Sequence, residues 1–269
     1  TVEKTEEAAP SLELVRRILE ERAPKGLQAL ALRWSSYFRI HHRQAAQLRV
    51  GRMFIAGDAA HIHSPFGGQG MNTGLHDVWN LAWKLDLVLH GHGNEELLSS
   101  YSAERRPVIK NVIETTDFLT RAMGTPSRLA QALRDAVIPM VSRLAPFQHA
   151  FVKRLSELGI AYRGSPIVEG AGERYFDDSL RGGDGIRNRF LLFLDNEADA
   201  STKQAAEELA GSFKDIVELR FRPGHDITLV RPDGYIAYSV HQRDGISALA
   251  SVRSLLERQT GSSRESTAA

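Results

Sequence analysis

The sequence predicts an α/β fold, and three observations carry this prediction. Residues 53–56 form a short apolar run that ends at Gly57-Asp58 and has the profile of a buried parallel strand. A glycine-rich loop at residues 61–70 and an apolar helix from about residue 72 to 90 follow this run. Beyond residue 187 the pattern becomes strand, helix, strand, hairpin and helix. Strands that alternate with helices in this way are typical of α/β folds.

The composition excludes several classes of function. Of the 269 residues, 42% are hydrophobic and 25% charged, as in an ordinary globular protein. The formal net charge of +1 gives no electrostatic indication of a nucleic-acid partner. No apolar stretch approaches the length of about 18 residues that a membrane span needs. The absence of cysteine excludes disulfides, thiolate nucleophiles and dithiol redox chemistry, and it favours a reducing, cytoplasmic location.

The amino-terminal elements follow from periodicity and from turn residues. Residues 11–23 are expected to form a helix that begins at the N-cap Ser11 and ends before Pro24-Lys25-Gly26. Residues 27–40 alternate like a half-buried strand. The aromatic residues of this segment would belong to the core or line a substrate pocket: Trp34, Tyr37 and Phe38.

Two long helical regions are predicted next. In the helix at 72–90, one face is expected to be buried through Leu75, Val78, Trp79, Ala82, Leu85 and Leu89. Trp83 lies four residues after Trp79, and both are expected to pack. Residues 95–157 are expected to be mostly helical, and the run Glu104-Arg105-Arg106 to form ion pairs on a helix surface.

The carboxy-terminal part is predicted as a separate domain. The division is residues 1–158, a linker at 159–186 rich in Gly, Ser, Pro and Asp, and a domain at 187–269. Strands are expected at 190–194, 216–221, 228–231 and 235–240, with helices at 202–210 and 246–258. The last two strands would form a hairpin around Pro232-Asp233-Gly234. Residues 259–269 are expected to be disordered.

The loop between residues 57 and 72 carries the chemical information. Asp58 follows an apolar strand, so its carboxylate would lie at a strand end and accept hydrogen bonds from ligand hydroxyls. Gly67, Gly68 and Gly70 would let a ligand approach the backbone closely. The loop then enters a helix, whose free N–H groups and macrodipole favour an anion or an electron-rich carbonyl. These features fit the ribityl chain and ring of a flavin, and a sugar phosphate would also satisfy them.

The stretch GDAAHIHSPFGGQGMNTGLHDVWNLAWKL resembles the second flavin-binding motif of FAD-dependent aromatic hydroxylases, the group A flavoprotein monooxygenases. The resemblance runs from residue 34 to about residue 120 and includes YSAERRPV at 101–108. The tail, with LVRPDGYIAY at 229–238, resembles the thioredoxin-like domain of the phenol and polyketide hydroxylase branch, here without a CxxC pair. The expected fold is therefore a partial FAD-binding domain like that of p-hydroxybenzoate hydroxylase, followed by a thioredoxin-like α/β domain.

The resemblance implies a cofactor, a reaction and a set of site residues. In this family NAD(P)H reduces FAD, and the reduced flavin uses O2 to hydroxylate an aromatic substrate. Asp58 would bind the ribityl chain, Pro65 would lie at the flavin face near the substrate, and N–H groups at the helix start would face the flavin carbonyl edge. The full set of expected cofactor-binding residues is Asp58, Pro65, Gly67, Gly68, Gln69, Gly70, Met71 and Asn72. No catalytic side chain is assigned. A metal site at Asp58, His61 and His63 is the weaker reading, and His61 is expected to pack locally.

One departure from the family is large. The GxGxxG motif that holds the ADP half of FAD is missing, and Gly182-Gly183-Asp184-Gly185 does not replace it. The chain is therefore expected to be the carboxy-terminal portion of a longer enzyme, inactive by itself, with a homodimer or a complementing amino-terminal fragment as partner. The alternative function is a non-catalytic binding or assembly module with a vestigial flavin loop.

Overall fold

The computed structural model describes residues 11–37, 40–65, 68–123, 128–176, 188–224, 226–241 and 244–260, and the chain divides into two compact units at residue 41. In the first unit, helix α1 (Leu12–Arg22) begins at Ser11, whose side chain accepts a hydrogen bond from the Leu14 backbone at 3.2 Å. This helix and its N-cap confirm the prediction.

The strand predicted at residues 27–40 is wrong for the described residues, which are irregular there. A strand needs a neighbouring strand for its backbone hydrogen bonds, and no described strand pairs with this segment. Leu30 and Trp34 are 85% and 81% exposed, and Tyr37 is also exposed. Phe38 lies outside the described residues.

The second unit begins with two short antiparallel pairs. Strand β1 (Arg43–Gln44) pairs with β4 (His61–Ile62), and β2 (Arg49–Val50) pairs with β3 (Met53–Phe54). The prediction of a buried parallel strand at 53–56 is wrong. Gly51, at φ +58°, turns the chain back at once, so β3 pairs with the residues just before it and Met53 is 70% exposed.

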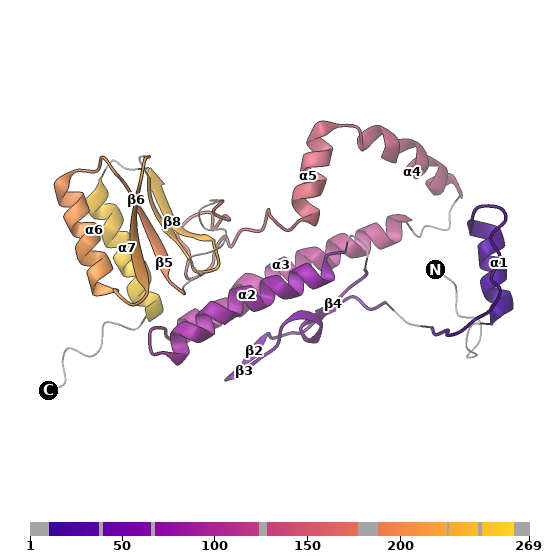
Figure 1. Ribbon diagram of the computed structural model, residues 1–269, viewed down its shortest axis with the longest axis horizontal. Helices are drawn as coiled ribbons and strands as arrows, with labels where there is room; N and C mark the ends of the chain where they lie inside the picture. The colour runs from indigo at the N-terminus through magenta and orange to yellow at the C-terminus, as the bar shows by residue number, and fades with distance from the viewer. Residues whose placement is uncertain are drawn as a thin grey trace. The chain divides into compact units, whose positions relative to one another are not determined.

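Four helices follow the glycine-rich loop. They are α2 (Gly70–Leu89), α3 (Glu95–Met123), α4 (Arg128–Val141) and α5 (Ala145–Leu155), which confirms the predicted helical regions. Helices α2 and α3 lie side by side (Figure 1). A small apolar core lies around them and is made of Leu48, Ala60, Leu81, Tyr101 and Ile109.

Helix α2 buries a face that the hydrophobic pattern did not predict. Leu75, Val78, Trp79 and Leu89, expected to be buried, are between 47% and 73% exposed. The buried positions are Thr73, Asp77, Asn80, Leu81, Trp83, Lys84 and Leu87, four of which are polar or charged. The polar groups can be buried because each has a partner in a hydrogen-bond network described below. Packing is confirmed for Trp83, whose ring meets Phe190 edge-on at 5.6 Å.

The carboxy-terminal part contains a four-stranded mixed sheet with the order β6-β5-β7-β8. Strand β5 (Phe190–Asp195) pairs in parallel with β6 (Val217–Arg222) and antiparallel with β7 (Asp226–Val230), which pairs antiparallel with β8 (Ile236–His241). Helices α6 (Ala200–Ser212) and α7 (Gly245–Thr260) lie side by side against the sheet (Figure 1). The predicted order of strands and helices is confirmed.

The hairpin between β7 and β8 also follows the prediction. Its turn closes with the Gly234 backbone N–H donating to the Arg231 carbonyl at 2.9 Å, and Gly234 has φ +79°. At the chain end, Gln259 and Thr260 are buried in α7, so the disorder predicted from residue 259 is wrong for these two; residues 261–269 lie outside the described part. None of the described helices is long and apolar enough to span a membrane.

Candidate functional site

The expected cofactor-binding carboxylate, Asp58, lies in the short 3-10 turn Gly57–Ala59 directly after β3. Asp58 is exposed, and no hydrogen bond or ion pair joins its side chain to another described residue. The turn packs against α2 through two glycines. A Cβ on Gly74 would lie 3.3 Å from the Gly57 Cα, so a side chain at position 74 requires a shift of the turn, and Gly57 itself has φ +59°, which favours glycine.

The loop then enters α2, whose start has no side-chain cap. The N-cap is Gln69, and its side chain makes no capping hydrogen bond. Instead the Gln69 side chain is buried and donates to the Arg154 carbonyl at 2.9 Å. The first N–H groups of a helix have no intrahelical acceptor, and no hydrogen bond to another described residue is recorded for those of Met71 and Asn72. Met71 is 75% exposed at this end.

The remaining loop residues leave space at the backbone. Gly68 has φ +64°, and a Cβ placed there would meet no atom within 4 Å. Pro65 is exposed, while Gly70 begins the helix, and a Cβ placed on it would lie 3.8 Å from the His63 ring. Gly67 lies outside the described residues. The structure thus brings the Asp58 turn, the open side of the loop and the start of α2 into one region.

Asp77, on α2, holds the Gly57–Ala59 turn through its buried side chain. Its Oδ2 accepts a hydrogen bond from the Gly57 backbone N–H at 3.1 Å and lies 2.8 Å from His61 Nε2, while Arg105 Nε donates to its Oδ1 at 2.7 Å. Asp77 and Arg105 side chains are fully buried. Burial raises the pKa of Asp77, but the contacts with His61 and Arg105 outweigh it and hold the pKa below its usual value. The local packing role predicted for His61 is confirmed.

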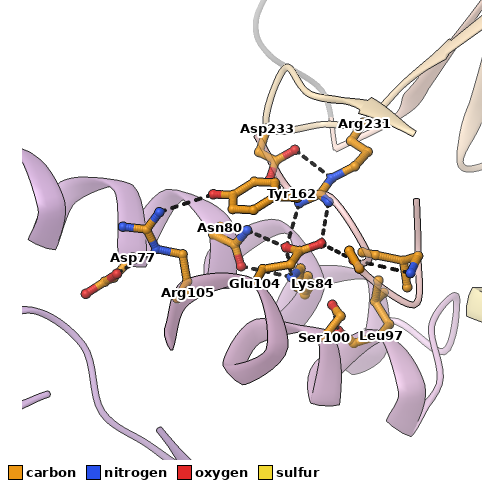
Figure 2. Close-up of polar contacts among 12 residues, drawn as sticks. Asp77, Asn80, Lys84, Leu97, Ser100, Glu104, Arg105, Tyr162, Arg231 and Asp233 are labelled. Atoms are coloured by element: carbon orange, nitrogen blue, oxygen red, sulfur yellow. Dashed lines mark hydrogen bonds and ion pairs between the residues drawn. The ribbon is translucent and has the colours of Figure 1, made fainter. Parts of the chain in front are cut away.

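A second buried cluster is centred on Glu104, the residue before Arg105 on α3 (Figure 2). The Glu104 carboxylate accepts two hydrogen bonds from the Arg231 guanidinium at 2.5 and 3.0 Å. It also accepts one from Lys84 and one from Asn80, each at 2.7 Å. Arg231 also binds Asp233 at 2.9 and 2.5 Å. We call Asn80, Lys84, Glu104, Arg231 and Asp233 the Glu104 cluster. Burial raises the pKa of Glu104, but Arg231 and Lys84 outweigh it and hold the pKa well below its usual range.

Aromatic rings surround the guanidinium of this cluster. The Arg231 guanidinium carbon lies 5.2, 5.0 and 5.9 Å from the ring centres of Trp83, Tyr162 and Tyr235. Tyr162 connects the two networks, because Arg105 donates to its hydroxyl at 3.3 Å. Contacts from α2 and α3 to the hairpin turn of the sheet therefore run through one continuous buried network (Figure 2).

The prediction of a surface ion-pair cluster at Glu104-Arg105-Arg106 is wrong for two of its members. Glu104 and Arg105 are 3% and 0% exposed, and only Arg106 faces solvent. Their partners lie 20 to 127 residues away in the sequence, so short-range spacing could not identify them. One signal was present: Thr73, Asp77, Asn80 and Lys84 form a polar stripe at helical spacing within an apolar helix.

Comparisons with known proteins show which family and fold the chain is similar to. The family of FAD binding domains matches residues 1–116. The anhydrotetracycline hydroxylase structure from Streptomyces rimosus superposes with a TM-score of 0.71 at 30% identity, over 95% of this chain and 54% of that one. The chain resembles part of a flavin-dependent aromatic monooxygenase. The family resemblance predicted from the sequence is confirmed.

Two curated relatives set the extent of the similarity. The 12-dehydrotetracycline 5-monooxygenase/anhydrotetracycline 6-monooxygenase of Streptomyces rimosus is 34% identical over 252 residues, which is 87% of this chain and 49% of that protein. The 6-methylpretetramide 4-monooxygenase of Streptomyces rimosus is 40% identical over 144 residues, 52% of this chain and 26% of that protein. The chain thus spans half or less of the length of these relatives.

The residues present fit one part of FAD. An exposed carboxylate with no partner among the described residues suits the hydroxyls of a ribityl chain, and a helix start without a side-chain cap suits the electron-rich carbonyl edge of the flavin ring. Glycine at position 68 leaves the loop backbone open to a flat ring. In the described part of the chain, no group of three or more His, Asp or Glu side chains is gathered as a metal site.

Proposed function

We propose that this chain supplies the isoalloxazine- and ribityl-facing half of the FAD site of an aromatic monooxygenase. The observation that carries the proposal is the uncapped start of α2 next to the exposed Asp58 turn. Asp58 would accept hydrogen bonds from the ribityl hydroxyls. The backbone N–H groups of Met71 and Asn72 would donate to the flavin carbonyl edge, where the positive end of the helix dipole favours negative charge.

The loop residues would complete this half-site. Pro65, Gly67 and Gly68 would lie along the ring, with Gln69 and Gly70 joining the loop to the helix. Asp77 would act indirectly, because its hydrogen bond to the Gly57 N–H sets the direction in which the next residue, Asp58, faces. When bound, the flavin supplies the chemistry by which NAD(P)H and O2 hydroxylate an activated aromatic ring.

The carboxy-terminal residues 187–269 form, in our proposal, a thioredoxin-like domain that follows a linker at 159–186 and the flavin-binding part at 1–158. The support is the order β6-β5-β7-β8, with one parallel pair, a hairpin and two helices. Since the sequence contains no cysteine, this domain would serve packing or subunit contact and not dithiol chemistry. The Glu104 cluster supports such a role by joining the hairpin turn to α3.

The exposed apolar side chains of α2 favour a polypeptide partner. Met71, Leu75, Val78 and Leu89 are each more than half exposed on this helix. Apolar side chains that gather on one helix favour a contact with another polypeptide surface. We propose a complementing amino-terminal FAD-binding segment or a second copy of the chain as this partner. A cytoplasmic location remains a prediction.

The experiment is a flavin titration followed by a turnover assay. The purified chain is titrated with FAD by fluorescence and then assayed for NAD(P)H oxidation with a phenolic substrate. We expect weak flavin binding and no substrate-stimulated turnover from this chain alone, and turnover when a polypeptide with the missing amino-terminal half is added. No flavin binding in either case would favour the alternative, a non-catalytic assembly module. Tight FAD binding with turnover from the chain alone would refute the half-site proposal.

A further inference from the structure

The two outer edges of the carboxy-terminal sheet differ in how they are covered. Strand β8 has the segment at residues 169–174 along its outer side, where the Glu169 backbone N–H donates to the Ala237 carbonyl at 2.7 Å. Strand β6, at the other edge, pairs with β5 alone among the described strands. An uncovered edge carries backbone groups that can pair with a strand of another chain, so the edge at β6 is a candidate interaction surface.

The backbone groups of β6 that point away from the sheet belong to its odd-numbered residues. At one end of the ladder with β5, the Phe190 N–H donates to the Ile216 carbonyl at 2.7 Å. At the other end, the Asn196 N–H donates to the Arg222 carbonyl at 3.1 Å. Backbone groups along a strand point alternately to its two sides, so the even-numbered residues face β5. The N–H and C=O groups of Leu219, near the middle of β6, therefore point outward.

The side chains of β6 divide between an apolar face and a charged face. Val217 belongs to the buried core, Leu219 packs against that core, and Phe221 is 46% exposed. On the opposite face, Arg220 Nε lies 2.8 Å from Glu218 Oε1, and both side chains are about one third exposed. Neither proline nor glycine occurs in β6, and its register with β5 is unbroken. The strand itself therefore carries none of the residues that usually prevent edge pairing.

The order of these side chains is complementary to itself in the antiparallel direction. A two-fold axis at Leu219 would place each Glu218 opposite Arg220 of the second copy, and each Val217 opposite Phe221. Leu219 would lie opposite itself as a hydrogen-bonded pair, which requires the outward N–H and C=O groups that it has. Glu218 and Arg220 would then form a non-hydrogen-bonded pair, the type in which cross-strand side chains lie closest. Every cross-strand pair is thus either apolar or of opposite charge.

Neighbouring registers do not share this property. An axis at Glu218 or at Arg220 would place that residue opposite its own copy, with like charges in contact. An axis at Phe221 would place Arg220 opposite Arg222. Like charges directly opposite each other destabilise a strand pair, so the charges of β6 select the axis at Leu219.

We propose that β6 is the interaction edge for a second copy of this chain, which pairs antiparallel with it about a two-fold axis at Leu219. The two four-stranded sheets would form one continuous sheet across this pair. The partner is a second copy because the charge order of Glu218 and Arg220 complements the same strand in reverse. A two-fold contact uses the same edge of both copies, so association ends at the dimer. The inference does not depend on the proposed flavin site.

The experiment measures self-association of the full chain by sedimentation velocity over a series of concentrations. We expect a monomer–dimer equilibrium for the wild type. Glu218→Arg and Arg220→Glu each replace two opposite-charge pairs by two like-charge pairs, so the dissociation constant should rise roughly tenfold or more in each variant. The control is Glu114→Arg on α3, an exposed charge reversal outside the sheet, which should leave the dissociation constant unchanged. Circular dichroism checks that all variants keep the fold.

Mixing the two single variants tests the register itself. A pair of Glu218→Arg with Arg220→Glu restores opposite charges at both positions, so the mixture should associate about as tightly as the wild type. The double variant Glu218→Arg/Arg220→Glu reverses the charge order in one chain and should also associate like the wild type. A wild type that stays monomeric at about 100 µM, single variants that dimerise as well as the wild type, or a mixture that does not associate would each overturn the inference. None of these outcomes bears on flavin binding at Asp58.

Discussion

Glu104→Gln isolates the charge of the buried cluster. Its Oε2 accepts from Asn80, Lys84 and Arg231 at 2.7 to 3.0 Å, and its Oε1 accepts from Ser165 and Arg231 at 2.6 and 2.5 Å. Whichever oxygen is replaced, the new NH₂ group faces at least two donors. Removing one partner of a buried ion pair typically costs about 3–5 kcal/mol. Because Arg231 keeps Asp233 and Lys84 keeps Asn80, we expect the lower end, about 3 kcal/mol.

The matched control is Glu114→Gln on the same helix. Glu114 forms an exposed pair with Lys110 at 3.8 Å, and such pairs contribute about 0–1 kcal/mol. Urea unfolding followed by circular dichroism gives both free energies of unfolding, and an unchanged m value establishes that stability alone has changed. A loss below about 1 kcal/mol in Glu104→Gln, equal to that of Glu114→Gln, would refute the reasoning that the cluster is a fully desolvated ion network.

Three further predictions concern acid stability, flavin affinity and packing. The pKa of Glu104 is lower in the folded chain than in the unfolded chain. Its contribution to stability is therefore fully present above the unfolded-state pKa and is lost as the pH falls below it. From pH 7 to 3 the free energy of unfolding should fall more steeply for the wild type than for Glu104→Gln. Asp58→Ala should weaken flavin binding about tenfold to a hundredfold and Asp58→Asn less, measured by flavin fluorescence in the presence of the complementing segment; wild-type affinity in both variants would exclude Asp58 as a ribityl ligand. Gly74→Ala should destabilise the fold by about 1–3 kcal/mol through the contact with Gly57, whereas Gly211→Ala in α6, which meets no atom within 4 Å, should be neutral or stabilising in the same urea assay.

Local patterns were sufficient for the carboxy-terminal sheet and for the helices. The turn at Pro232-Asp233-Gly234 and the apolar run at β5 depend on neighbours in the sequence, so the predicted hairpin and strand order match the structure. The segment at 27–40 has an equally good alternating pattern. It is not a strand, because a strand also requires a partner that no local pattern supplies.

The candidate site was predictable only in part. The glycine-rich loop and the start of α2 are local features, and α2 begins at Gly70, two residues before the predicted start. Sequence patterns do not identify the buried residues that hold the loop and the helix start. Asp77 is paired with Arg105, 28 residues away, and Glu104 is paired with Arg231, 127 residues away. Burial of these charges is favourable only through such distant partners. Periodicity of apolar residues therefore assigned the wrong face of α2 to the interior.

A comparison of riboflavin with FAD tests our proposal that the chain holds the ring and ribityl half of the flavin and lacks the nucleotide half. Both are titrated into the purified chain under identical conditions, and binding is followed by flavin fluorescence. We expect weak binding of both flavins with dissociation constants that agree to within about threefold, a difference of roughly 0.7 kcal/mol, because the ADP portion finds no partner. FAD binding a hundredfold or more tighter than riboflavin, about 2.7 kcal/mol, would reveal a nucleotide site in this chain and overturn the half-site proposal.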